Sequence, residues 1–517
     1  MSRSSSDFAP LSPAAGALAA VGAFVGLFGA YWDDAWHTDK GRDDFFIAPH
    51  ITLYSGVLVS GLVVAGWMLA GWRAQGWRVP PTLGALRRSP AAALALVGAV
   101  VTLASAPIDN TWHELYGRDA VLWSPPHMLG VVGSATLAVG VLAGVSTVAD
   151  RGGVIHTLLA AGVLGSLLVP VLEFDSDVPQ FPEWTYWPVV TAGLALFLML
   201  LRDLLPGSWM ATRVAAVYML VKLVIIAGLA SMDHSLTVLP LLLVVALVDD
   251  VLYARRVGAL ARGLASALTA SMAWSLSDAI QPGVATQVPL VQVPLAVGAS
   301  LAVAAAVVLV SGQAVIPRPR PAATLVMFTV TLSGLSLAFN PGTAWAHDPG
   351  QGPIAGQVQF TVDRSKESVN VQATVTPTLH TCAQLRPGNL VARRAGEVRR
   401  AHLNLTGCQV TGSLPLTQGR WFVHLELIDQ ADHHQPPTTF ESWIPVAADA
   451  ERLQETKDLY DATATTTGTS AAQMISGVTL YLIVAALLAA ALRLARATGG
   501  RRAGDQGIPA STVGQQS

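Results

Sequence analysis

Charged residues and cysteines are scarce in this chain. Of its 517 residues only 12% are charged, and two are cysteines, Cys382 and Cys408. There is no glycine-rich phosphate loop, no Cys-x-x-Cys pair and no Ser-His-Asp pattern, so nucleotide binding, thiol redox chemistry and serine-type hydrolysis are not indicated. The formal net charge of −2 gives no reason to expect a nucleic acid partner.

Apolar residues are abundant instead. They make up 52% of the chain, and the mean hydropathy of +0.49 is typical of a polytopic membrane protein. About twelve apolar runs are long enough to cross a bilayer, which predicts an all-α membrane domain over residues 1–345 and a last transmembrane helix over 471–495. The runs lie near 14–32, 50–72, 90–108, 125–148, 154–173, 186–204, 213–231, 235–253, 263–280, 289–313, 323–341 and 471–495.

The basic loops predict the orientation of these spans. Arginines follow the second, fourth, eighth, tenth and last runs, so all of them face one side if the N-terminus is cytoplasmic. We therefore expect a multi-pass protein of the cytoplasmic (inner) membrane with both termini in the cytoplasm and a disordered tail over 496–517.

Residues 346–450 have a different pattern. Short alternating runs separated by Pro, Gly, Asn and Asp turns predict an extracytoplasmic antiparallel β-sandwich of roughly seven strands, inserted between the last two spans. Residues 451–470 are expected to be a polar linker. Outside the cytoplasm, Cys382 and Cys408 are expected to form a disulfide bond.

The junction before this domain carries a further signal. Ala344-Trp345-Ala346 resembles a signal-peptidase site, and cleavage there would leave His347 as an N-terminal residue able to chelate copper. His433 and His434 are additional candidate ligands in the soluble domain. Ala-rich ends of apolar runs also occur without cleavage, and surface histidines are often only solvated, so both alternatives stay open.

Two copies of one polar motif stand where membrane helices are expected to meet water. Each copy has an Asp and a His four residues apart and a second His after a spacer of twelve or thirteen residues. The candidate metal ligands are Asp33, His37 and His50 in the first copy and Asp109, His113 and His127 in the second. Candidate partners that orient the ligands are Arg42, Asp43, Arg118 and Asp119.

The residue types and their spacing indicate a transition-metal site. Asp and His four residues apart share one helix face, and a Pro before the second His suits the first turn of the next helix. One carboxylate and two imidazoles suit copper, zinc or iron, and three protein ligands leave positions open for water, oxygen or substrate. The alternative is structural: interfacial Trp residues and Asp–Arg ion pairs occur without any metal.

An acidic loop over residues 173–183 is a weaker candidate. It holds Glu173, Asp175, Asp177 and Glu183 beside several aromatic residues, and one interpretation is that it attracts cations to the outer face. A solvated acidic loop beside interfacial aromatics explains the same pattern.

The paired motifs resemble the C subunit of the copper membrane monooxygenases, the particulate methane and ammonia monooxygenase family. That subunit carries Asp-x3-His-x12-His and a second Asn-x3-His-x13-His set. The first copy here matches with its Pro shifted next to the His, and the second has Asp109 in place of Asn. The resemblance covers residues 30 to 130 and implies that both sets hold copper, one of them as a candidate site of oxygen activation.

The rest of the chain departs from that subunit. The whole chain is about twice as long as that subunit. Its soluble domain after His347 looks like the family's B subunit but lacks the His-x-His motif. The resemblance implies a copper protein that oxidises a small apolar substrate or ammonia, with other monooxygenase-type subunits or further copies of itself as partners. A copper transport, delivery or storage protein is the alternative, and a structural subunit with zinc or no metal is a third.

Overall fold

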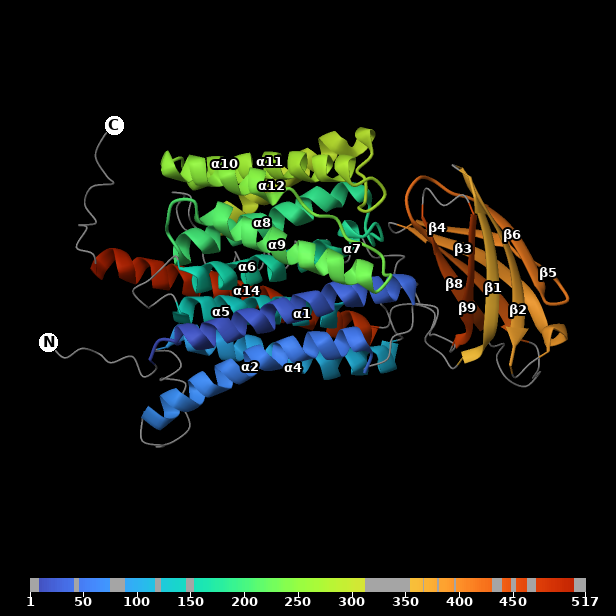
Figure 1. Ribbon diagram of the computed structural model, residues 1–517, viewed down its shortest axis with the longest axis horizontal. Helices are drawn as coiled ribbons and strands as arrows, with labels where there is room; N and C mark the ends of the chain where they lie inside the picture. Colours follow the sequence, from blue (N-terminus) through green and yellow to red (C-terminus); the bar gives the residue numbers. More distant parts are fainter. Residues whose placement is uncertain are drawn as a thin grey trace.

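The apolar segments form a bundle of long helices, and an antiparallel β-sheet domain lies at one end of it (Figure 1). The computed structural model describes residues 9–40, 46–74, 89–116, 122–145, 153–311, 354–365, 367–378, 381–394, 397–429, 439–447, 452–462 and 471–505. The longer helices are α1 (Pro13–Asp39), α2 (Ala48–Ala74), α4 (Pro90–Tyr116), α5 (Pro125–Val145), α6 (Val154–Leu168), α8 (Tyr186–Leu204), α9 (Met210–Ser231), α10 (Leu242–Ala254), α11 (Ala259–Ile280), α12 (Val293–Val310) and α14 (Ala471–Asp505). Short helical turns are η1 (Val169–Val171), α7 (Leu172–Asp175), η2 (Glu183–Thr185) and η3 (Leu290–Gln292).

Nine helical segments in the described part of the chain are long and apolar enough to cross a membrane. Large apolar side chains such as Leu62, Val100 and Leu220 are exposed on the outside of the bundle, where lipid tails would cover them. The chain is therefore a multi-pass membrane protein, as predicted.

The described residues do not show all twelve expected spans. The run near 235–253 is helical only over Leu242–Ala254, and the segment before it, which contains Pro240, has no regular secondary structure. At about 20 Å this helix is shorter than the hydrocarbon core of a bilayer. Helix α11 forms as expected but is not among the nine apolar segments, and the run near 323–341 lies outside the described residues.

Helices α1 and α2 form one tightly packed pair, and α4 and α5 form another. In the first pair, a Cβ on Gly56 would lie 2.3 Å from the backbone nitrogen of Gly26. In the second, a Cβ on Gly140 would lie 2.4 Å from the backbone nitrogen of Ala95. Such close contact of backbones through small residues is typical of helix pairs in membranes.

The soluble domain is one nine-stranded antiparallel sheet with the strand order β4-β3-β7-β8-β9-β1-β2-β6-β5. Its strands are β1 (Ile354–Arg364), β2 (Ser368–Pro377), β3 (Leu385–Arg394), β4 (Glu397–His402), β5 (Asn404–Thr406), β6 (Gln409–Pro415), β7 (Trp421–Asp429), β8 (Thr439–Val446) and β9 (Arg452–Ala462). Strands β3 and β4 at one edge contact β5 and β6 at the other, so the sheet curls almost into a barrel. Alternate residues such as Phe360, Trp421 and Ile444 fill its interior.

Three sequence predictions for this part of the chain need correction. The prediction of a seven-stranded sandwich is wrong in detail, because nine strands form one curled sheet. The prediction of a linker over 451–470 is wrong for Arg452–Ala462, which form β9 and pair with both β1 and β8. The tail was expected to be disordered from 496, but α14 continues to Asp505.

The predicted disulfide bond is confirmed. Cys382 is bonded to Cys408, and 26 positions separate them in the sequence. Cys382 follows β2, whereas Cys408 lies in the turn between β5 and β6. The bond therefore fastens this turn to the chain that leaves β2.

Replacement of both cysteines by serine should lower the free energy of unfolding of the sheet domain by about 3 kcal/mol, because the unfolded chain regains the entropy of an open loop. Hydrogen exchange of β2 and β6 in the full-length protein measures this loss. Reduced wild-type protein serves as the matched control and should exchange equally fast. Unchanged exchange in the variant would contradict the prediction.

Two carboxylates face each other across strands β7 and β8. Glu441 is the direct cross-strand partner of Glu426. Burial and, to a smaller extent, the charge of Glu426 raise the pKa of Glu441 to about 7, against the opposing effect of Arg393. The folded domain therefore holds a proton on Glu441 at pH values where the unfolded chain, with a pKa of 4.5, has lost it.

The stability of the sheet domain should consequently fall as the pH rises from 4.5 to about 7. Glu441→Gln cannot ionise, so at pH 8 it should be more stable than wild type by about 2 kcal/mol and at pH 4 equally stable. Thermal unfolding followed at both pH values tests this. An equal difference at the two pH values would rule out Glu441 as the titrating group.

Candidate metal centre

The three candidate ligands of the first motif converge where α1 and α2 meet. Asp33 and His37 lie one turn apart on α1, and His50 lies in the first turn of α2. The Nε2 atoms of His50 and His37 are 3.1 Å and 3.6 Å from Oδ1 of Asp33. One ligand atom from each residue lies within 4.8 Å of those of the other two. In the part of the chain that the structure describes, this is the group that could hold a metal ion.

The packing of α1 against α2 explains this convergence. A Cβ on Gly29 would lie 2.4 Å from the backbone nitrogen of Leu53, so the two helices are in backbone contact there. Asp33 follows Gly29 by one helical turn, and His50 precedes Leu53 by nearly one turn in the antiparallel partner. Absence of a side chain at Gly29 thus lets the imidazole of His50 reach the carboxylate of Asp33.

The second motif occupies the corresponding positions on α4 and α5. His127, in the first turn of α5, places Nε2 3.2 Å from Oδ1 of Asp109 on α4. The backbone of His113 lies on α4 one turn after Asp109, but its side chain is outside the described part of the structure. The structure therefore brings together two of the three residues predicted for this set.

Both sets face one cavity of about 200 Å³ between α1, α2, α4, α5 and the α6–α7 segment. The lining runs along α1 from Ala19 to His37, a distance of about 27 Å. Away from the Asp and His residues the wall consists mainly of Gly, Ala, Leu and Val with a few hydroxyl groups. One end of the cavity is therefore polar and the remainder is apolar.

The polar end favours a bound cation. Four carboxylates line it, from Asp33, Asp34, Asp109 and Glu173, beside three imidazoles. Among the described residues of the lining there is no Lys or Arg. Carboxylates in a partly buried site are unfavourable unless a cation compensates their charge, and a metal ion held by the imidazoles would do so.

Two of these carboxylates were not among the predicted ligands. Asp34 accepts a hydrogen bond from Oγ of Ser176 at 2.5 Å. Glu173 is 6% exposed, and its Oε1 accepts from the backbone N–H of Leu122 at 2.8 Å and from the side chain of Gln180. Within the described residues, Oε2 of Glu173 has no hydrogen-bond partner. Asp34 adjoins a predicted ligand, but no pattern in the sequence connects Glu173 with the motifs.

The acidic loop is largely buried, which overturns its interpretation as a solvated loop. Glu173, Asp175 and Asp177 are 6%, 1% and 4% exposed. Asp175 forms an ion pair of 3.0 Å with Lys222 and accepts a hydrogen bond from Tyr186. Protein atoms, rather than solvent, therefore surround these carboxylates.

Several predicted residues cannot be compared with the structure. Arg42, Asp43, Arg118, Asp119, His347, His433 and His434 lie outside the described residues. The predicted orienting role of the Arg-Asp pairs, the cleavage before His347 and a metal site in the soluble domain therefore stay predictions from sequence.

The available donors are nitrogen and oxygen atoms. Imidazole and carboxylate ligands suit copper, zinc or iron, and no Met or Cys side chain lines the described cavity. This excludes the thiolate-containing ligand set of a blue-copper electron carrier at this position. The residues present fit a metal ion with open coordination positions, but they do not distinguish among the three metals.

Comparisons of the chain with protein-family models, with curated proteins and with solved structures give no match.

His50→Ala should weaken Cu²⁺ binding at the first set by more than roughly 100-fold. Mutation of a residue that only hydrogen-bonds to a metal ligand commonly lowers metal affinity by about 10- to 100-fold, and loss of a ligand itself should lower it more. Competition with a chelator of known affinity, on the full-length protein, measures the dissociation constant. His402→Ala removes an exposed histidine of the sheet and is the matched control. Equal affinities in the two variants would refute the assignment of His50.

Proposed function

We propose that this chain is an integral-membrane copper protein of the copper monooxygenase type. One observation carries the proposal: two Asp/His sets from two similar helix pairs face the polar end of a single cavity whose remainder is apolar. A polar reactive centre beside an apolar chamber suits oxidation of a small apolar molecule that arrives through the bilayer. Ammonia is a second substrate that the resemblance implies.

The proposed ligands are Asp33, His37 and His50 in one set and Asp109, His113 and His127 in the other. When bound, copper would supply the redox chemistry that reduces dioxygen. The balanced reaction joins substrate R–H, O₂, two electrons and two protons to give R–OH and water. A quinol in the bilayer is the proposed source of the electrons.

The chain itself contributes binding and proton handling. The apolar wall holds the substrate and limits the entry of water. Asp34 and Glu173 line the polar end but are not proposed ligands, and their carboxyl groups are suited to deliver the two protons. Arg42 and Arg118 are proposed to orient the ligand carboxylates.

The proposed location is the cytoplasmic membrane, with the metal end of the bundle and the sheet domain on the outer side. The sheet lies at the end of the bundle where α1 ends and α14 begins (Figure 1). The basic loops on which the orientation depends include Arg255 and Arg256, after α10. Because the chain differs from the family's C subunit in length and in its sheet domain, we propose that it works with further subunits or copies of itself.

Copper transport, delivery or storage is the second candidate. The observation that favours it is the length of the cavity, which follows α1 for much of a bilayer's thickness and has four carboxylates and three imidazoles at one end. In this function the carboxylates and imidazoles collect the ion, and the sheet domain captures it outside.

The two functions predict different results for wild-type protein in nanodiscs. We expect near-stoichiometric copper and, with a quinol and ¹⁸O₂, oxidation of a short alkane or of ammonia to a product that carries the label. His37→Ala combined with His127→Ala should lose most of the copper and the oxidation. His402→Ala, outside both sets, is the control.

The possible outcomes separate the candidates. Copper-loaded protein that incorporates no label, together with altered copper accumulation in cells that lack the gene, would favour transport. Unchanged copper in the double variant would overturn the site assignment for either function.

A further inference from the structure

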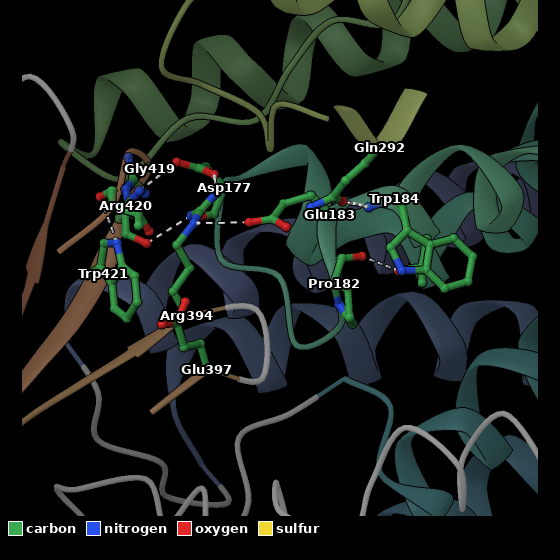
Figure 2. Close-up of polar contacts among 12 residues, drawn as sticks. Asp177, Pro182, Glu183, Trp184, Gln292, Arg394, Glu397, Gly419, Arg420 and Trp421 are labelled. Carbon is green, nitrogen blue, oxygen red and sulfur yellow. Dashed lines mark hydrogen bonds and ion pairs between the residues drawn. The ribbon is translucent and has the colours of Figure 1, made fainter. Parts of the chain in front are cut away.

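The sheet domain is joined to the helical bundle through residues 173–183, here called the bridging segment (Figure 2). Asp177 lies between two arginines of the sheet. Its Oδ1 is 2.8 Å from a guanidinium nitrogen of Arg394 on β3, and its Oδ2 accepts the backbone N–H of Arg420 at 2.8 Å. A second carboxylate of the segment, Glu183, lies 3.8 Å from Nε of Arg394.

This contact is buried on both sides. Asp177 and Arg394 are 4% and 7% exposed. Burial raises the pKa of Asp177, and the two arginines oppose that shift. Separation of the sheet would leave a desolvated carboxylate without its cationic partner, so the docked arrangement is strongly preferred to a partly opened one.

The same segment contacts the candidate metal centre. Ser176, next to Asp177, donates to Oδ2 of Asp34, the neighbour of the proposed ligand Asp33. Three residues earlier, Glu173 lines the polar end of the cavity. Directly after the segment, the chain is attached to the bundle, since the backbone N–H of Trp184 donates to Oε1 of Gln292 at 3.1 Å.

A second connection reaches α1 two residues after His37. The guanidinium of Arg420 donates to the carbonyl oxygen of Ser176 at 3.3 Å and to Oγ of Ser235 at 3.2 Å. Ser235 in turn donates its backbone N–H to Asp39 at 2.7 Å. Lys457 on β9 donates to the carbonyl oxygen of the same Asp39 at 2.7 Å. The sheet domain therefore contacts the C-terminal end of α1 directly, and it contacts Ser176, the residue that binds Asp34.

We infer that the docked sheet domain is a positioning part of the metal centre, with Asp177, Arg394 and Arg420 as the positioning residues. Their contacts hold Ser176 against Asp34 and hold the end of α1, and so keep Asp33 and His37 in place for His50. The inference rests on the proposed function in that it takes this set to bind copper. Neither Arg394 nor Arg420 lines the cavity. The charge of Arg420 acts on Asp34 directly, whereas Arg394 is connected to the candidate site through the bridging segment, so Arg394 is the sheet residue to substitute.

Asp177→Asn is the sharpest test. Asp177 has a φ of 57°, which Asn tolerates better than most residues, and the amide keeps the size of the side chain while losing its charge. We expect Cu²⁺ to bind about tenfold more weakly, within the range usual for coupled sites, and the electron paramagnetic resonance spectrum of bound Cu²⁺ to change. Arg394→Gln breaks the same ion pair from the sheet side and should have a similar effect. The double variant should bind Cu²⁺ little more weakly than either single variant, because all three lack the same Asp177–Arg394 ion pair.

Arg399→Gln is the matched control. Its guanidinium pairs with Glu397 at 2.6 Å on the same strand and does not contact the bridging segment. The full-length protein is used throughout, and hydrogen exchange of residues 173–183 reports whether the sheet has loosened.

Each result has a definite meaning. Weaker Cu²⁺ binding and an altered spectrum in Asp177→Asn and Arg394→Gln, with Arg399→Gln like wild type, support the inference. Faster exchange in the bridging segment with unchanged Cu²⁺ affinity and spectrum would overturn it, because the contact would then serve stability alone. Wild-type protein that binds no Cu²⁺ would overturn the proposed function and this inference with it. If Asp177→Asn fails to fold, Arg394→Gln alone decides between the first two results.

Discussion

The close contact of helix backbones within each pair decides where the candidate ligands lie. On α1 and α2 the glycines permit an approach that side chains would prevent, and the approach at Gly29 sets His50 against Asp33. The α4–α5 pair repeats this arrangement with Asp109 and His127. Because the candidate ligands of each set come from two helices, their convergence depends on helix packing.

Charge is the second constraint. Carboxylates gather at one end of the bundle, where some face the cavity and others face the sheet domain. Those that face the sheet, such as Asp177, are paired with arginines, whereas those of the cavity have imidazoles and no lining Lys or Arg among the described residues. The bridging segment contributes to both groups, since its Glu173 lines the cavity and its Asp177 binds the sheet domain.

Much of this arrangement could be predicted from sequence where the signal is local or repeated. Apolar runs predict membrane helices, the cysteines predict their disulfide bond, and the duplicated motif predicts that Asp33, His37 and His50 lie together. The burial of Glu173 and its place in the cavity could not be predicted, because they depend on contacts with Leu122 and Gln180. Strand β9 was mistaken for a linker because its polar residues alternate weakly, and its pairing with β1 and β8 decides its structure.

The sequence by itself determined that this is a membrane protein and which residues are the candidate ligands, because apolar runs and motif spacing can be read locally along the chain. Only the tertiary structure decided that both sets share one cavity, that two further carboxylates line it, and that the sheet contacts the segment whose Ser176 binds the neighbour of Asp33. The physical reason is that electrostatic compensation and burial depend on distances between segments remote in the chain, such as the 243 positions between Asp177 and Arg420. No local pattern in the sequence encodes those distances.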